Sequence, residues 1–233
     1  MKKILINDNF WQTRIAIMRD DSLQNIYFDS YAAQRLERCY FKGVVTKILP
    51  GIQTAFVDIG QARAGFLHIS EIDRDLAIKR MSSKEDIEEE DEASSTVSIR
   101  PTELDISKIL KEKEHILIQV SKEPIHEKGA KLTTCFTLPG RFLVLMPNIP
   151  RIGISKKIEE PEERQRLREL LKAHLPTGMG AIIRTTSEHK NQTEIIRDLT
   201  YLVNTWEEIQ EKFKKAQTEE KIHEDINLSL QAV

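Results

Sequence analysis

The chain has 233 residues, of which 39% are hydrophobic, 31% charged and 6% aromatic, and its formal net charge is -2. This length accommodates one to three compact domains, and the composition excludes a collagen, a coiled coil, a mucin and a wholly disordered chain. Because positive and negative charges nearly balance, any nucleic-acid site must be local rather than spread over the whole surface.

The chain also lacks the signals of a secreted or membrane protein. No stretch of about 18 apolar residues is present, and the first ten residues lack the apolar centre of a secretory signal. Its two cysteines, Cys39 and Cys135, form no CxxC pair and no cluster with histidine, so neither a disulfide framework nor a structural zinc site is implied. We therefore expect a soluble, cytoplasmic protein with no transmembrane segment.

The first half of the chain is rich in predicted strands. Alternating apolar residues predict a three-stranded meander at 3–7, 14–19 and 23–28, and a short helix is expected at 31–39. A second block has strands predicted at 40–49, 53–60, 64–69 and 115–120. Short strands separated by turn residues favour a small closed barrel over a parallel sheet, and we expect the barrel to close at the last of them.

An acidic segment interrupts this barrel. Residues 73–105 break the strand pattern, and the stretch EDIEEEDE at 85–92 holds seven acids in eight positions. Such a run is typical of a disordered or loosely helical, solvated insertion, the alternative being a site for a specific partner. Helical spacing resumes at 104–113.

The third block predicts an α+β unit. Strands are expected at 132–138 and 141–146, and Pro161 stands where the first turn of a helix that stops at Pro176 would begin. An apolar strand, AIIRT, follows, and an apolar stripe predicts a last helix at about 192–216. The tail from residue 217 is polar, and its pattern suggests an unfinished domain.

Two phenylalanines are the first candidate site. Strand alternation turns Ala55, Val57 and Ile59 inward, so Phe56 faces outward, and the same reading of the next strand turns Phe66 outward. A pair of outward aromatic rings on a small barrel is typical of a surface that stacks single-stranded bases. The alternative is that a neighbouring domain covers both rings.

Cations near strand ends form a second group of candidates. The lysines Lys42, Lys122, Lys128 and Lys131 could hold phosphates, although isolated lysines usually face solvent. In the third block, Arg184 and Thr185 end an apolar strand, where a guanidinium and a hydroxyl can together grip a terminal phosphate. An ordinary ion pair of the arginine is the alternative.

The sequence contains no recognisable catalytic motif. The sequence contains no GxSxG, HExxH, phosphate-binding Walker loop or dinucleotide motif. Asp8 and Asp58 are possible ligands of a hard cation, but neither has a partner acid at a suggestive spacing. We therefore predict no catalytic residue and no metal site in this chain.

Several long motifs nevertheless resemble one family. They are MKKILIN at the start, YFKGVVTKILPGIQTAFVDIGQARAGFLHISEI at 40–72, KGAKLTTCFTLPGRFLVLMPN at 128–148, GISKKIE at 153–159 and LPTGMGAIIRTTSE at 175–188. Together they resemble the amino-terminal half of the bacterial ribonuclease E/G family. The resemblance implies an α+β fold, in which an OB-fold barrel and a 5′-sensor subdomain interrupt a partial RNase H-like subdomain.

The resemblance also implies how the chain is divided. Residues 1–38 would begin the RNase H-like subdomain, 39–121 would form the OB-fold barrel with the acidic insertion at 73–105, and 122–216 would form the 5′-sensor. Residues 217–233 would be a linker and the start of the return to the RNase H-like part.

The family's functional residues map onto this chain motif by motif. Phe56, Phe66 and Lys128 would bind RNA, and Arg184 with Thr185 would bind a 5′-monophosphate, supported by the backbone at Gly140 and Val144. Lys156 replaces a family arginine in the ISRRIE motif, so the charge is kept but the bidentate fork is lost.

The implied activity is that of an endoribonuclease that cleaves single-stranded RNA in RNA processing and decay and senses a 5′-monophosphate. The family's Mg²⁺-binding aspartates and its CPxC zinc link would lie beyond residue 233, so this chain is expected to be inactive alone. Homo-oligomers are expected only of the full-length family enzyme. The alternative is a stand-alone, non-catalytic RNA-binding protein. A reading frame that continues past Val233 into paired aspartates and CPxC would distinguish the two.

Overall fold

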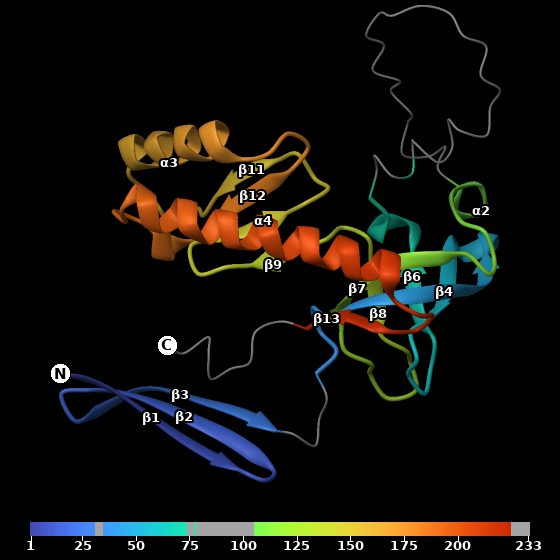
Figure 1. Cartoon of the computed structure of the whole chain (residues 1–233), viewed down its shortest axis with the longest axis horizontal. Helices are drawn as coiled ribbons and strands as arrows, with labels where there is room; N and C mark the ends of the chain where they lie inside the picture. Colours follow the sequence, from blue (N-terminus) through green and yellow to red (C-terminus); the bar gives the residue numbers. More distant parts are fainter. Residues whose placement is uncertain (31–34, 74–76, 78–104, 225–233) are drawn as a thin grey trace, which may run out of the picture.

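The computed structural model describes residues 1–30, 35–73, 77 and 105–224. The predicted acidic insertion and the end of the polar tail therefore lie largely outside the described residues. None of the described helices is both long enough and apolar enough to cross a membrane. The described part is an α+β structure with three sheets, shown in Figure 1.

The amino-terminal segment forms the predicted antiparallel meander. Its strands are β1 (Lys2–Asn9), β2 (Gln12–Arg19) and β3 (Ser22–Ser30). Asp20 and Asp21 both have positive φ, 49° and 61°, as a tight two-residue hairpin turn requires. Ile15 in the central strand is fully buried, whereas most of the large apolar side chains around it are exposed. The sheet lies apart from the two other layers in Figure 1.

The second sheet is a closed five-stranded barrel, as the alternation predicts. It consists of β4 (Tyr40–Leu49), β5 (Thr54–Asp58), β6 (Gly65–His68), β7 (His115–Lys122) and β8 (Lys131–Thr133). The strands follow the order β4-β5-β6-β8-β7, and an antiparallel pairing of β4 with β7 closes the ring. Its apolar interior includes Val45, Val57, Leu67 and Ile118. This architecture is that of an OB fold.

Short helical turns join the barrel strands. They are η1 (Pro50–Ile52), η2 (Ile69–Glu71) and α2 (Ile106–Ile109). The predicted helix at 104–113 is thus only one turn. Of the predicted helix at 31–39, residues 31–34 are not described, and the rest is an irregular turn whose Leu36 and Glu37 amides donate to the Glu123 carboxylate, each at 2.7 Å.

Two strands correct the sequence-based assignment of the barrel. The expected strand at 132–138 is divided: β8 completes the barrel, and only β9 (Leu138–Pro139) joins the third sheet. Between them the chain leaves the ladder because the Gln119 side chain binds the Thr137 amide and carbonyl, at 2.9 and 2.8 Å. The tail also differs, since β13 (Lys221–His223) pairs with the start of β4.

The third unit packs two helices with a four-stranded sheet. The sheet order is β11-β12-β10-β9, with β10 (Leu143–Met146), β11 (Ile152–Ile154) and β12 (Gly180–Ile183). The helices are α3 (Pro161–His174) and α4 (Gln192–Lys215), close to their predicted bounds, and η4 (Thr185–Ser187) follows β12. The Asn191 side chain caps α4 by accepting the Thr193 amide at 3.2 Å.

The long helix α4 connects this unit to the barrel, as Figure 1 shows. Tyr40 of β4 is fully buried in the same apolar cluster as Trp206 of α4, and their ring centroids are 6.4 Å apart. At the end of α4, Lys42 Nζ donates to the Ala216 carbonyl at 2.8 Å and lies 5.2 Å from the centre of the Phe213 ring. The barrel strand β4 therefore contributes Tyr40 to the core of the third unit, while the barrel interior is a separate apolar cluster.

Candidate nucleic-acid interface

The barrel presents the two predicted aromatic residues side by side. Phe56 and Phe66 are direct partners across β5 and β6, and both are half-buried. Their neighbours Val57 and Leu67 are fully buried on the opposite face. The predicted alternation is therefore correct for this pair of strands, with one exception: Thr54, on the outward parity, is buried and donates to the Ile52 carbonyl at 3.0 Å.

Lysines flank the aromatic pair within the same cross-strand row. In register, Lys47 of β4 lies opposite Phe56, and Lys131 of β8 lies opposite Phe66. Lys131 also lies opposite Lys122 of β7 in the backbone register, and its ammonium group forms an ion pair with Glu71. The row Lys47, Phe56, Phe66 and Lys131, called here the aromatic row, thus places two rings between cations. Lys47 is a member that the sequence analysis missed because the β4 bulge shifts its register.

His68, which strand alternation also turns outward, is a further residue on this face. It lies two residues after Phe66, so its side chain emerges on the face of the aromatic row. Its Nδ1 accepts a hydrogen bond from the Ser70 amide at 3.2 Å, and it is also hydrogen-bonded to the Ser70 hydroxyl at 2.8 Å. Because Nδ1 accepts the amide, the neutral ring carries its proton on Nε2, the atom left for a ligand.

Lys128 is exposed in the tight turn before β8, where its amide donates to the Ile125 carbonyl at 2.9 Å. The next residue must be glycine, because a Cβ at Gly129 would lie 1.9 Å from the Ala64 carbonyl oxygen. This close approach brings the KGA segment against the start of β6, next to Phe66. The fold therefore brings the turn that carries Lys128 close to the aromatic row, although Lys128 and Phe66 are 62 positions apart in sequence.

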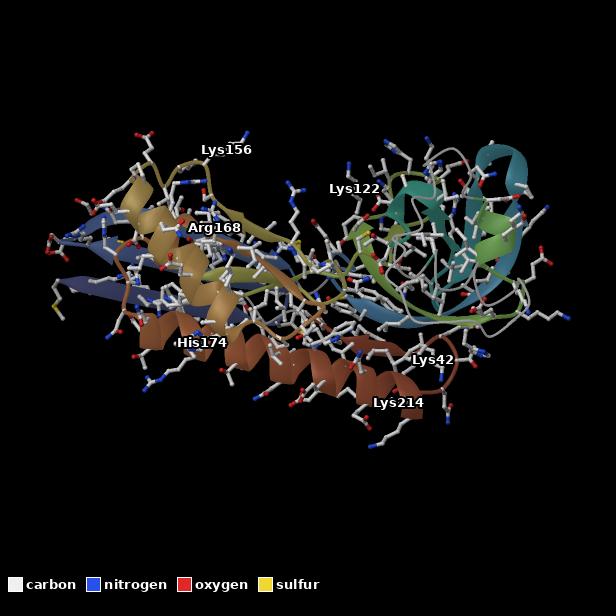
Figure 2. All side chains as sticks on the ribbon, turned by 90° about the horizontal axis from the view of Figure 1, so that it is seen from above. Lys42, Lys122, Lys156, Arg168, His174 and Lys214 are labelled. Carbon is white, nitrogen blue, oxygen red and sulfur yellow. The ribbon has the colours of Figure 1, made fainter. Side chains whose placement is uncertain are left out.

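Lys42 does not belong to this surface. Its ammonium group contacts Ala216 and Phe213, so it joins the barrel to α4. Figure 2 shows Lys122 and Lys156 projecting from one side of the molecule, whereas Lys42 and Lys214 lie along the opposite side. The hypothesis that Lys42 holds a phosphate is therefore not favoured by its position.

The third unit brings Arg184 against the loop between β9 and β10. Arg184 Nη1 donates to the Gly140 carbonyl at 2.6 Å, and the Arg184 amide donates to the Phe142 carbonyl at 2.9 Å. Arg184 and Thr185 are both exposed at the end of β12. This group of Gly140, Arg184 and Thr185 is called here the arginine pocket; the name stands for these three residues and not for a cavity.

Lys156 and Val144 lie at different distances from this pocket along the sheet. Strands β11 and β12 run parallel with Ile154 opposite Ile183, so the exposed Lys156 emerges at the same sheet edge as Thr185. Val144 lies further inside the sheet, half-buried and opposite Ile182. Register thus favours Lys156 over the Val144 backbone as a neighbour of the pocket.

An ion pair anchors the chain just after the pocket. Glu163 of α3 accepts two hydrogen bonds from Arg166, both at 2.7 Å, and one from the His189 amide at 2.9 Å. The Arg166 hydrogen bonds, with the His189 amide, hold the pKa of the Glu163 carboxyl below its ordinary value, despite the opposing effect of burial. This contact fixes the segment after η4 to α3.

Comparison with known proteins identifies the family to which the chain belongs. Residues 137–233 match the model of the ribonuclease E/G family, and residues 40–107 match that of the S1 RNA binding domain. Ribonuclease G of Escherichia coli K12 is 34% identical over 227 residues, which are 97% of this chain and 44% of the relative. The chain belongs to the ribonuclease E/G family.

Two other relatives also match nearly the whole of this chain. Ribonuclease G of Haemophilus influenzae is 36% identical over 95% of this chain and 42% of its own length. Ribonuclease E of Escherichia coli K12 is 32% identical over 100% of this chain and 20% of its own length. The chain thus spans less than half the length of these ribonucleases. The match to the S1 domain model begins at β4, the strand with which the observed barrel begins.

The described residues contain no site that fits the magnesium implied by the family resemblance. Within residues 1–30, 35–73, 77 and 105–224, no group of three His, Cys, Asp or Glu side chains is placed to hold a metal ion. Asp58 instead accepts the Gly60 amide at 3.0 Å, and Asp8 accepts the Thr13 hydroxyl at 2.5 Å. We therefore derive no chemical step through a metal in these residues.

Proposed function

We propose that the chain is the RNA-recognition part of a ribonuclease E/G-type endoribonuclease that acts on single-stranded RNA in RNA processing and decay. The observation that carries this proposal is the aromatic row on a barrel that matches an S1 RNA binding domain. Half-exposed rings side by side offer stacking platforms to successive bases, and the lysines at both ends of the row attract the phosphates.

The barrel would hold RNA without reading much sequence. Stacking on an aromatic side chain is available to every base, and it contributes about 1–3 kcal/mol per base. Lys128, beside Phe66, would neutralise backbone phosphate, and His68 Nε2 would donate to a base or a phosphate. Binding should therefore weaken as salt rises, because each neutralised phosphate releases counterions.

The arginine pocket would bind the 5′-monophosphate of the RNA. A terminal phosphate carries more negative charge and more free acceptor oxygens than an internal phosphodiester, and Arg184 and Thr185 present donors at one sheet edge. Lys156 would add a point charge there. Because lysine lacks the planar fork of the family's arginine, its contribution to discrimination would be smaller.

The remaining parts of the proposal follow from the family. We propose that residues 1–38 begin an RNase H-like subdomain, that 39–121 and 122–216 are the barrel and the 5′-sensor, and that 217–233 lead back to the first. We further propose that Mg²⁺-dependent cleavage needs residues outside these 233, that homo-oligomers form only with them, and that the protein acts in the cytoplasm.

The test is the affinity of the chain for two RNA oligonucleotides that differ only in a 5′-monophosphate or a 5′-hydroxyl, at one salt concentration. We expect the monophosphate form to bind more tightly than the hydroxyl form, and the ratio of the two affinities is called here the phosphate advantage. Arg184→Ala should reduce the phosphate advantage by roughly tenfold and so remove most of it. Thr185→Val should remove less, because it deletes a neutral donor. Equal affinity of the unmutated chain for both RNAs would refute phosphate sensing, and no affinity for either would refute RNA recognition.

A further inference from the structure

An aspartate outside the arginine pocket organises the loop that builds it. Asp198 lies on α4, and its carboxylate accepts three successive backbone amides of the loop between β9 and β10. The distances are 3.2 Å from Arg141, 2.8 Å from Phe142 and 3.3 Å from Leu143. Successive amides that converge in this way form a nest for an anion, and here the anion is a side chain of the protein itself.

The carboxylate also explains why residue 140 is glycine. A Cβ at Gly140 would lie 2.5 and 2.8 Å from the two Asp198 carboxylate oxygens and 2.8 Å from Leu202 Cδ1, closer than real contacts allow. Gly140 is not among the glycines with positive φ, so the backbone conformation alone does not require it. Glycine is required here because the Asp198 carboxylate and the Leu202 side chain occupy the space of a Cβ. Gly140 and Asp198 therefore act as a pair that fixes the loop against α4.

The opposite side of this loop holds the segment that carries Arg184. The Gly140 carbonyl accepts from Arg184 Nη1 at 2.6 Å, and the Arg141 carbonyl accepts from the Thr186 hydroxyl at 2.6 Å. The loop is thus fastened on one side to Asp198, and on the other side its carbonyls orient the residues after β12. Any loosening of the amides would move the carbonyl that aims the guanidinium.

We propose that Asp198 is a positioning residue for 5′-phosphate recognition: it touches no phosphate, and it aims Arg184 through the Gly140 loop. A negative charge in the nest has a second effect. It saturates three amide donors that would otherwise offer the phosphate a competing site behind the pocket, so the phosphate is directed to Arg184. This inference rests on the proposed role of Arg184 and Thr185 in binding a 5′-monophosphate.

The test uses Asp198→Asn, which keeps the side chain's shape but removes its charge and one acceptor oxygen. With the pair of 5′-monophosphate and 5′-hydroxyl RNAs, we expect the phosphate advantage to fall by about tenfold, while affinity for the hydroxyl RNA stays within about twofold. Leu199→Ala is the matched control. It removes the adjacent, buried side chain of α4 and should lower the melting temperature without changing the phosphate advantage.

A double-mutant cycle separates positioning from mere stabilisation. If Asp198 acts through Arg184, adding Asp198→Asn to Arg184→Ala should reduce the phosphate advantage no further, whereas independent effects would add. Should Asp198→Asn fail to fold, Gly140→Ala tests the same pair, because its methyl group must displace the carboxylate as well as the Leu202 side chain. It too should lower the phosphate advantage.

The outcomes distinguish this inference from the function on which it rests. If the unmutated chain shows no phosphate advantage, the proposed sensing is wrong and the inference falls with it. If the advantage exists and depends on Arg184 but survives Asp198→Asn or Gly140→Ala in full, the sensing stands and the positioning role is refuted.

Discussion

Truncation of the aromatic row offers the most direct test of the barrel surface. In Phe66→Ala, the loss of one stacking platform should weaken binding of 5′-hydroxyl RNA by about 1–3 kcal/mol, which corresponds to roughly 5- to 150-fold in Kd. Phe66 is half-buried, faces away from the barrel interior, and lies opposite Phe56 and Lys131 in register. A cross-strand side-chain pair contributes about 0.2–1 kcal/mol, so the loss of stability should be small.

The control is the next residue along the strand. Leu67 is fully buried on the opposite face, so Leu67→Ala should destabilise the barrel by about 2–5 kcal/mol. At a temperature where both variants are folded, it should leave RNA affinity nearly unchanged. Fluorescence anisotropy at fixed salt measures the affinities, and chemical denaturation measures the stabilities. If Phe66→Ala behaves like Leu67→Ala, losing stability but not affinity, the ring is a structural residue and the stacking proposal is wrong.

Three further predictions concern other parts of the chain. The purified 233-residue chain should bind RNA without cleaving it in Mg²⁺, and Mg²⁺-dependent cleavage that Asp8→Asn or Asp58→Asn abolishes would contradict this. Lys156→Arg, which restores the family's fork, should increase the phosphate advantage in the paired binding assay, and an unchanged ratio would show that residue 156 does not reach the phosphate. Because the folded pKa of Glu163 is depressed, its ion pair stabilises the fold above the unfolded pKa of about 4.3, and this stability is lost as pH falls through the folded pKa. Denaturation at several pH values should thus show a flatter acid decline for Glu163→Gln, and identical declines would refute the ion pair's contribution.

The sequence predicted those features whose signals are local. Pro161 and the apolar stripe of α4 placed both long helices close to their observed bounds, because caps and helical periodicity act over a few residues. Alternation likewise placed Phe56 and Phe66 on one face. The family motifs supplied Arg184 and Thr185, which the structure brings to the Gly140 loop.

The features that escaped prediction depend on contacts between distant residues. Asp198 has no local motif, and its partners lie 55 to 57 positions earlier in the chain. Strand β13 is too short for an alternation signal, and it exists because β4 offers it a partner. Lys42 looked like other exposed lysines in sequence, and only the fold places it beneath the end of α4. Such pairings depend on tertiary context rather than on propensity.

Helix α4 joins two fastenings that hold the third unit and the barrel at a fixed separation. Asp198 fastens it to the Gly140 loop, and Lys42 fastens its end at Ala216 to the barrel. Eighteen residues of helix separate these two fastenings, a distance of roughly 27 Å at 1.5 Å per residue. The helix therefore acts as a rigid strut, so we expect the barrel surface and the arginine pocket to keep one spacing when RNA binds.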